Sequence, residues 1–133
     1  MLAATRGLLW LLLLCLAALS ATAEAAPRAA AAETVAASIR GAHLAEPLVA
    51  TAPTTAAEDQ ALVEALAAYE QRSAPGDTGS LTGFLQHYPH SGWAPALLTD
   101  LGLIYLHDGY FSRALDAWSE AWHEGKDATE PQA

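Results

Sequence analysis

The sequence is short of cysteine and of basic residues, and each shortage excludes a class of function. The single cysteine, Cys15, lies inside an apolar run near the N-terminus. We therefore expect neither disulfides nor thiol catalysis. Only 6 lysines and arginines stand against 15 acidic residues, which gives a formal net charge of −9. Because such a surface repels phosphate backbones, we expect no nucleic-acid partner, and the charge favours a basic or neutral protein or peptide.

The chain also lacks the apolar run of roughly 20 residues that a membrane-spanning helix needs. Its N-terminus carries Arg6, then a shorter apolar run over residues 8–19, then the small residues 20–23. This order is typical of a secretory signal peptide, and Ala21-x-Ala23 predicts cleavage after Ala23. Residues 1–23 therefore predict an exported protein, periplasmic or secreted, with no other membrane association. Retention of the run as an uncleaved anchor is the alternative.

Composition divides the remaining chain into a linker, a helical region and a tail. Residues 24–54 are rich in alanine and proline and offer few large apolar side chains. Such a segment buries too little surface to offset the entropy lost on ordering. We therefore predict a flexible linker over 24–54, with a short docked helix near 33–40 as the alternative. Residues 127–133 predict a disordered tail.

Residues 55–126 predict an all-α domain of two helical hairpins. No segment alternates polar and apolar residues for long enough to predict a strand. Thr55 and Glu58 have the spacing of a capping box. Asp77 or Thr78 is expected to cap the second helix, and Gly125 to take the left-handed position after the fourth. The breaks between these signals predict helices over about 55–72, 78–88, 91–107 and 110–124.

Gly102 interrupts a segment that otherwise favours a helix, at a cost of about 1 kcal/mol relative to alanine. Our interpretation is that small residues lie where the third and fourth helices cross, so that the two helices pack closely. Gly102, Ala114 and Ala121 are the small residues available. We expect Leu101, Tyr105, Leu115 and Trp118 to fill the surrounding space. On this interpretation Gly102→Leu is disruptive and Gly102→Ala is much milder.

These residues carry a resemblance to a known family. The tetratricopeptide repeat (TPR) has the pattern W-x₂-L-G-x₂-Y…A-x₃-F…P. Residues 95–126 resemble it, although Pro131 falls late for the closing proline, and residues 57–92 resemble a degenerate first repeat. The matching or repeat-packing positions are Leu98 (in place of the tryptophan), Leu101, Gly102, Tyr105, Ala114, Trp118 and Ala121.

The resemblance implies a bacterial exported α-solenoid of about two TPR-like repeats, which acts as a non-catalytic scaffold for protein–protein interaction. A groove in such an array is lined mainly by the first helix of each hairpin. The implied partner-binding residues are Glu64, Arg72, Thr99, Leu103 and Leu106, with Trp122 at the exposed end.

A short array leaves its last hairpin uncovered, because roughly three repeats are normally needed for stability. Phe111, Ala114, Leu115, Trp118 and Trp122 form one apolar stripe, and no polar capping helix follows them. We expect this face to be covered by a partner, by self-association, or by further repeats. In the last case the chain is an N-terminal fragment or assembly arm of a larger secreted enzyme or toxin-like protein. These alternatives remain open at this point.

No catalytic or metal-binding constellation is visible in the sequence. His87, His90, His107 and His123 are spaced in a way that does not supply a tetrahedral zinc site. Asp100, Asp108 and Asp116 recur every eight residues, but they span a helix turn. Their side chains are therefore not expected to converge on one site. Since no nucleophile pairs with a base, we predict no enzymatic activity, no catalytic residue, no metal and no cofactor.

Overall fold

The computed structural model describes residues 25–127, so the predicted signal peptide and nearly all of the predicted tail lie outside the described residues. The chain divides into two units, residues 1–34 and residues 35–133. Residues 25–40 are helical, and no strand occurs between residues 25 and 127. No helix within these bounds is both long and apolar enough to cross a membrane.

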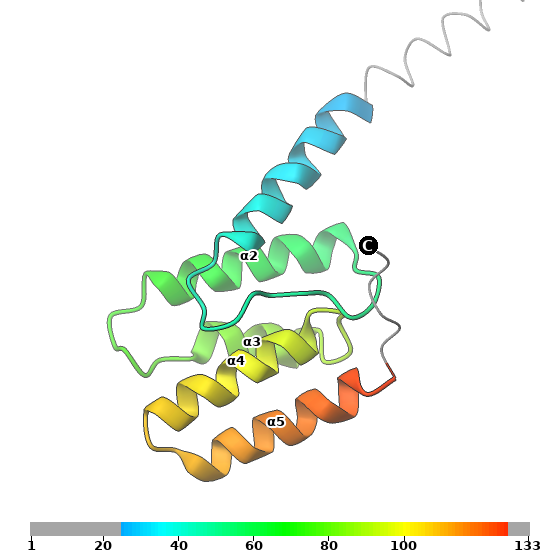
Figure 1. Cartoon of the computed structure of the whole chain (residues 1–133). Helices are drawn as coiled ribbons and strands as arrows, with labels where there is room; N and C mark the ends of the chain where they lie inside the picture. Colours follow the sequence, from blue (N-terminus) through cyan, green and yellow to red (C-terminus); the bar gives the residue numbers. More distant parts are fainter. Residues whose placement is uncertain (1–24, 128–133) are drawn as a thin grey trace, which may run out of the picture. The chain divides into compact units, whose positions relative to one another are not determined.

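Four further helices follow in the second unit: α2 (Ala56–Glu70), α3 (Gly79–His87), α4 (Ala94–His107) and α5 (Phe111–Gly125) (Figure 1). Helix α3 packs against α2, and α5 packs against α4. The prediction of an all-α fold with helices in these four places is therefore confirmed. The helix over residues 25–40 is additional to these four and covers the segment near 33–40 for which a short helix was the alternative prediction.

The residues predicted to cap the N-termini of α2 and α3 largely make the expected hydrogen bonds. The N–H of Glu58 donates to the hydroxyl of Thr55 over 3.2 Å, and the N–H of Thr55 donates to the Glu58 carboxylate over 2.7 Å. The Thr55 hydroxyl also donates to this carboxylate over 2.7 Å. The bonds that the carboxylate accepts from the Thr55 hydroxyl and N–H lower the pKa of Glu58. At α3, the side chain of Asp77 accepts the N–H of Gly79 at 2.9 Å, whereas Thr78 makes no capping bond through its side chain.

The turn between α4 and α5 uses a glycine in the left-handed conformation. Gly109 has a φ of 82°, and its N–H donates to the carbonyl of Leu106 over 3.1 Å. The N–H of Tyr110 donates to the carbonyl of Tyr105 over 2.7 Å, which completes a Schellman-type end. The expectation for Gly125 is wrong, because Gly125 is the last residue of α5 and does not have a positive φ.

The core of the second unit lies between α2, α3 and α4. It is built from leucines and aromatic residues that are nearly inaccessible to solvent. Helix α5 contributes only alanines to the buried residues. The buried large side chains are Leu62, Leu66, Tyr69, Leu81, Phe84, Leu97 and Leu101, joined by Ile39 and Leu48.

The expected flexible linker differs from what the structure shows. Ile39, at the end of the helix over 25–40, and Leu48 are 2% and 8% exposed and belong to the core. The irregular residues 42–54, which we call the strap, lead from that helix to α2 (Figure 1). Composition missed this packing because two isolated apolar residues suffice when neighbouring backbone atoms also find hydrogen-bond partners.

Candidate interaction surface

Two polar anchors hold the strap against α4 and the loop before it. The N–H of Glu46 donates to Oδ1 of Asp100 over 2.9 Å. The N–H of Thr51 donates to the carbonyl of Gly92 over 2.8 Å. A Cβ atom at Gly92 would lie only 2.9 Å from the carbonyl carbon of Ala52, so glycine permits the backbones to approach closely.

Asp100 is the residue that sequence reasoning missed. Its side chain is 1% exposed, and Oδ2 has no hydrogen-bond partner. Burial raises the pKa of Asp100 and the Glu46 carboxylate adds to the rise, while backbone N–H groups of the strap oppose it. The available signal was an acid on the buried side of an apolar helix, which requires a partner from elsewhere in the chain.

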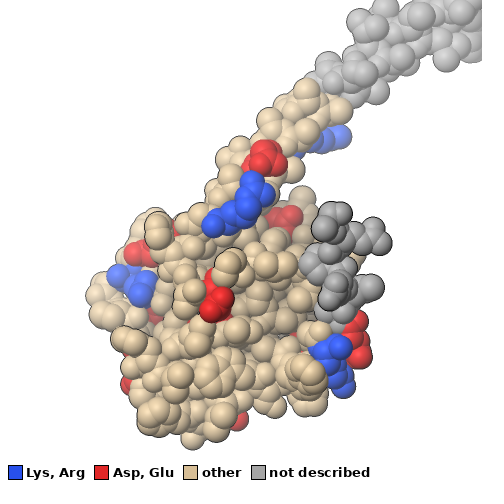
Figure 2. Space-filling view, viewed as in Figure 1, with Lys and Arg blue, Asp and Glu red and all other residues tan. Residues whose placement is uncertain are grey.

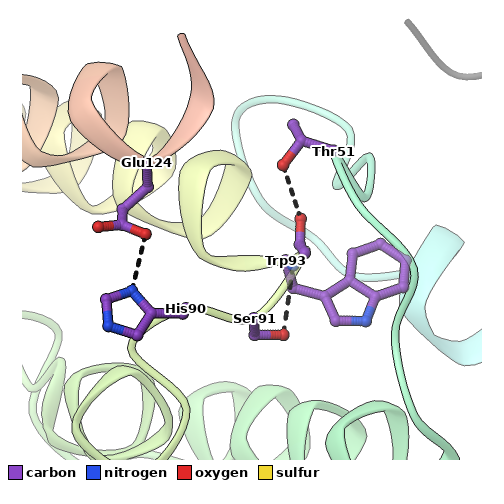
Figure 3. A network of polar contacts seen from close by, with 6 residues as sticks. Thr51, His90, Ser91, Trp93 and Glu124 are labelled. Atoms are coloured by element: carbon purple, nitrogen blue, oxygen red, sulfur yellow. Dashed lines mark hydrogen bonds and ion pairs between the residues drawn. The ribbon is translucent and has the colours of Figure 1, made fainter. Parts of the chain in front are cut away.

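The segment between α3 and α4 connects three other parts of the second unit (Figure 3). Nδ1 of His90 lies 3.0 Å from the carboxylate of Glu124 on α5. The indole N–H of Trp93 donates to Asp59 on α2 over 2.7 Å, and the carbonyl of Gly92 accepts the N–H of Thr51 in the strap. Because these contacts converge on one loop, the strap and the two hairpins are fixed together.

Two of the candidate histidines, His87 and His90, make structural contacts. Nδ1 of His87 lies 3.0 Å from the carbonyl of Gly83 in its own helix, away from the contact that His90 makes. In the part of the chain that the structure describes, no three His, Cys, Asp or Glu residues gather closely enough to hold a metal ion.

The indole ring of Trp118 packs directly against Gly102. A Cβ atom at this position would lie 2.6 Å from Cε2 of Trp118 and closer still to Nε1 and Cδ1. The indole N–H donates to the carbonyl of Thr99 over 3.1 Å. The glycine thus makes room for a side chain of α5. Because one added methyl group would already collide with this ring, we expect Gly102→Ala to cost more than the sequence alone predicts.

The other repeat-packing residues divide between the core and its margin. Leu98, Leu101 and Ala114 are at most 5% exposed, and Gly102 is buried as well. Tyr105 is half-buried, with its hydroxyl 3.3 Å from that of Thr78, and Trp118 and Ala121 are also half-buried.

Leu115 departs from the expectation that it fills the space at the crossing of α4 and α5. Its side chain is 65% exposed. The buried residues of α5 are Ala114 and Ala117 instead, and Trp118 contacts α4 at Gly102 and Thr99.

A groove of about 760 Å³ runs between the strap, α4 and α5. Three of the predicted partner-binding residues, Thr99, Leu103 and Trp122, line it together. The strap contributes Glu46 and Val49, which the sequence analysis had assigned to a flexible linker. We call this feature the strap groove. Its lining is largely apolar, and Glu46 is the charged residue among those that line it.

The remaining predicted partner-binding residues lie elsewhere. Glu64 is exposed on α2 and accepts a hydrogen bond from Gln60 over 3.0 Å. The guanidinium carbon of Arg72 lies 3.7 Å from the centre of the Tyr69 ring, and the side chain donates to the carbonyl of Pro75. Arg72 thereby fixes the end of α2. Leu106 is 41% exposed on α4 and does not line the strap groove.

A second groove, of about 450 Å³, lies among α3, α4 and α5 and is more polar. Helix α5 contributes Arg113, Asp116 and Glu120 to its lining. The guanidinium carbon of Arg113 lies 5.1 Å from the centre of the Tyr110 ring. The charged side of α5 therefore faces this second groove and not the strap groove.

Comparisons of the chain with protein-family models, with curated proteins and with solved structures found no match. The class that fold and surface define is an all-α protein with two helical hairpins, a docked strap and an apolar groove.

Proposed function

We propose that the chain is a non-catalytic protein–protein interaction module of the TPR-like kind, exported to the periplasm or secreted, which binds a peptide segment of another protein in the strap groove. The observation that carries this proposal is the convergence of Thr99, Leu103 and Trp122 on one groove. Seated against Gly102, the Trp118 ring joins two positions of the TPR-like pattern and lines the same groove.

The chemistry of the groove favours a particular kind of peptide. Val49 and Trp122 are 50% and 69% exposed, so they offer apolar surface that an aliphatic or aromatic side chain can cover. Glu46 and the net charge of −9 favour a peptide that is neutral or basic. An extended segment with an apolar anchor beside a lysine or arginine meets both requirements.

Selection from a random peptide display library on the immobilised chain tests this proposal. We expect enriched peptides to combine an apolar anchor with a basic residue, and their binding to weaken at least tenfold with Leu103→Asp. Ala68→Asp, at an exposed position of α2, is the matched control and should bind normally. Failure to enrich any such peptide, or equal loss with both variants, would contradict the proposal.

Export is tested separately by N-terminal sequencing of the protein isolated from its host. We expect a chain that begins at Glu24 in the periplasmic or extracellular fraction. An intact Met1 on protein in the cytoplasmic fraction would overturn the proposed location without affecting the groove.

The exposed face of α5 favours a second candidate, in which the module is the assembly arm of a longer secreted protein and another hairpin covers that face. Fusing a polar capping helix after Lys126 tests it. If an adjacent hairpin is the natural neighbour, the cap should raise the melting temperature. An unchanged melting temperature would count against this candidate.

A further inference from the structure

Helix α5 buries its small side chains and exposes its large ones. Its buried residues are Ala114 and Ala117. Phe111, Leu115 and Trp122 are 65%, 65% and 69% exposed. At about 100° per residue, these three and the half-buried Trp118 fall within one narrow arc of the helix. We call these four residues the α5 stripe.

The spacing of the stripe is that of a coiled-coil seam. Its residues follow one another at intervals of four, three and four, the alternation that keeps one side of a helix facing a partner helix. These intervals are the same when they are counted from either end of the helix. The stripe is therefore complementary to itself when a second α5 runs antiparallel, as an interface about a two-fold axis requires.

We propose that the α5 stripe pairs with the α5 stripe of a second copy of this chain, the two helices running antiparallel about a two-fold axis that passes between residues 116 and 117. This register places Phe111 opposite Trp122 of the second copy, and Leu115 opposite its Trp118. Each large side chain then meets another large apolar side chain, and the axis repeats both contacts.

Charge supports a second copy even though the whole chain is acidic. Asp116 and Glu120 point into the more polar groove with Arg113, and Glu124 contacts His90. At about 100° per residue, all three acids lie on the far side of α5 from the stripe. Ser112 and Ser119 flank the stripe instead. The face shown in Figure 2 is largely free of charged side chains over α4 and α5. Two copies can therefore approach without apposing carboxylates.

The apolar area that the α5 stripe exposes limits how tightly two copies can bind. Since aromatic side chains bury about 150–250 Å² each, the exposed parts of Phe111, Leu115 and Trp122 offer on the order of 400 Å² per copy. Standard interfaces bury about 800 Å² per partner. The stripe and its serine rim therefore predict a weak dimer that forms only at high protein concentration.

Analytical ultracentrifugation over a range of concentrations tests the pairing in the chain as isolated from cells. We expect a monomer–dimer equilibrium that Leu115→Glu weakens at least tenfold. Val49→Glu, which changes an equally prominent apolar residue of the strap groove, should leave the equilibrium unchanged. A chain that stays monomeric at hundreds of micromolar, or a dimer that Leu115→Glu leaves intact, would overturn the proposal. Circular dichroism of each variant verifies that it is folded.

The register is tested by mixing variants. Phe111→Glu and Trp122→Lys should each dimerise poorly alone, but a mixture should form a heterodimer because the new charges face each other. A mixture of Phe111→Glu with Leu115→Lys, whose charges do not face each other, is the control. Equal association in both mixtures would overturn the antiparallel register. Trp118 and Trp122 also line the strap groove. The dimer is therefore judged by Leu115→Glu and peptide binding by Leu103→Asp, because each of these residues belongs to one feature only, and the two proposals can fail independently.

Discussion

The two helical hairpins use their apolar residues in opposite ways. In the α2–α3 hairpin the large side chains point inward, and Leu62 and Leu81 are fully buried. In the α4–α5 hairpin, α4 is buried as deeply, but α5 turns alanines inward and leaves Leu115 and Trp122 largely exposed. The first hairpin forms the core together with α4 and the strap. The second hairpin leaves an apolar face of α5 exposed, which is the physical basis of the interaction that we propose for this helix.

A matched pair of leucine truncations tests this contrast most strongly. Leu81→Ala should destabilise the protein by about 2–5 kcal/mol, because it removes buried contacts and leaves a cavity. Leu115→Ala should change the stability of the monomer by less than about 0.5 kcal/mol. Denaturant unfolding at low protein concentration measures both. Comparable losses would mean that α5 contributes to the core after all.

The next largest effect on stability is expected at the contact between Gly102 and the Trp118 ring. Gly102→Ala should cost about 1–3 kcal/mol despite its gain in helix propensity, because the added methyl group displaces the indole. In a Trp118→Ala background the same change should be neutral or stabilising. This double-mutant cycle, measured by thermal and urea unfolding, isolates the contact. An equal cost in both backgrounds would show that Gly102 faces something other than Trp118.

The start of α2 gives a smaller effect, confined to the first hairpin. Thr55→Ala removes the hydroxyl that accepts the Glu58 N–H and should cost about 1 kcal/mol. Thr55→Ser retains an acceptor and serves as the control. Unfolding midpoints of the three proteins measure the difference. If alanine and serine behaved alike, the capping box would contribute nothing to stability.

The smallest effect concerns the pH dependence that Asp100 confers on the strap. Because its folded pKa is raised, its contribution to stability is fully present below its ordinary pKa of about 3.9 and is lost as pH rises through the folded value. Asp100→Asn retains an acceptor for the Glu46 N–H and should reduce this fall. Asp116→Asn, at an exposed position, controls for the loss of one acid. Urea unfolding between pH 3 and 7 compares them, and identical slopes would contradict this role.

The sequence by itself determined the helices of both hairpins. Thr55 and Glu58 marked one start, and Asp108-Gly109 marked a turn, because capping and left-handed turns depend on residues only a few positions apart. It also identified Gly102 as a close contact, although not what it contacts. Thr99, Leu103 and Trp122 were proposed from the pattern of the resemblance, and they do lie together.

Only the tertiary structure decided what happens at a distance in sequence. The strap packs because Asp100 and Gly92 accept the N–H groups of Glu46 and Thr51, at separations of 54 and 41 residues. Local composition carries no information about such partners. The direction of α5 was undetermined for a similar reason, since Ala114 and Leu115 lie on adjoining parts of one apolar surface. The Trp118 ring packs on Gly102, so the alanines face inward while Phe111, Leu115 and Trp122 stay exposed.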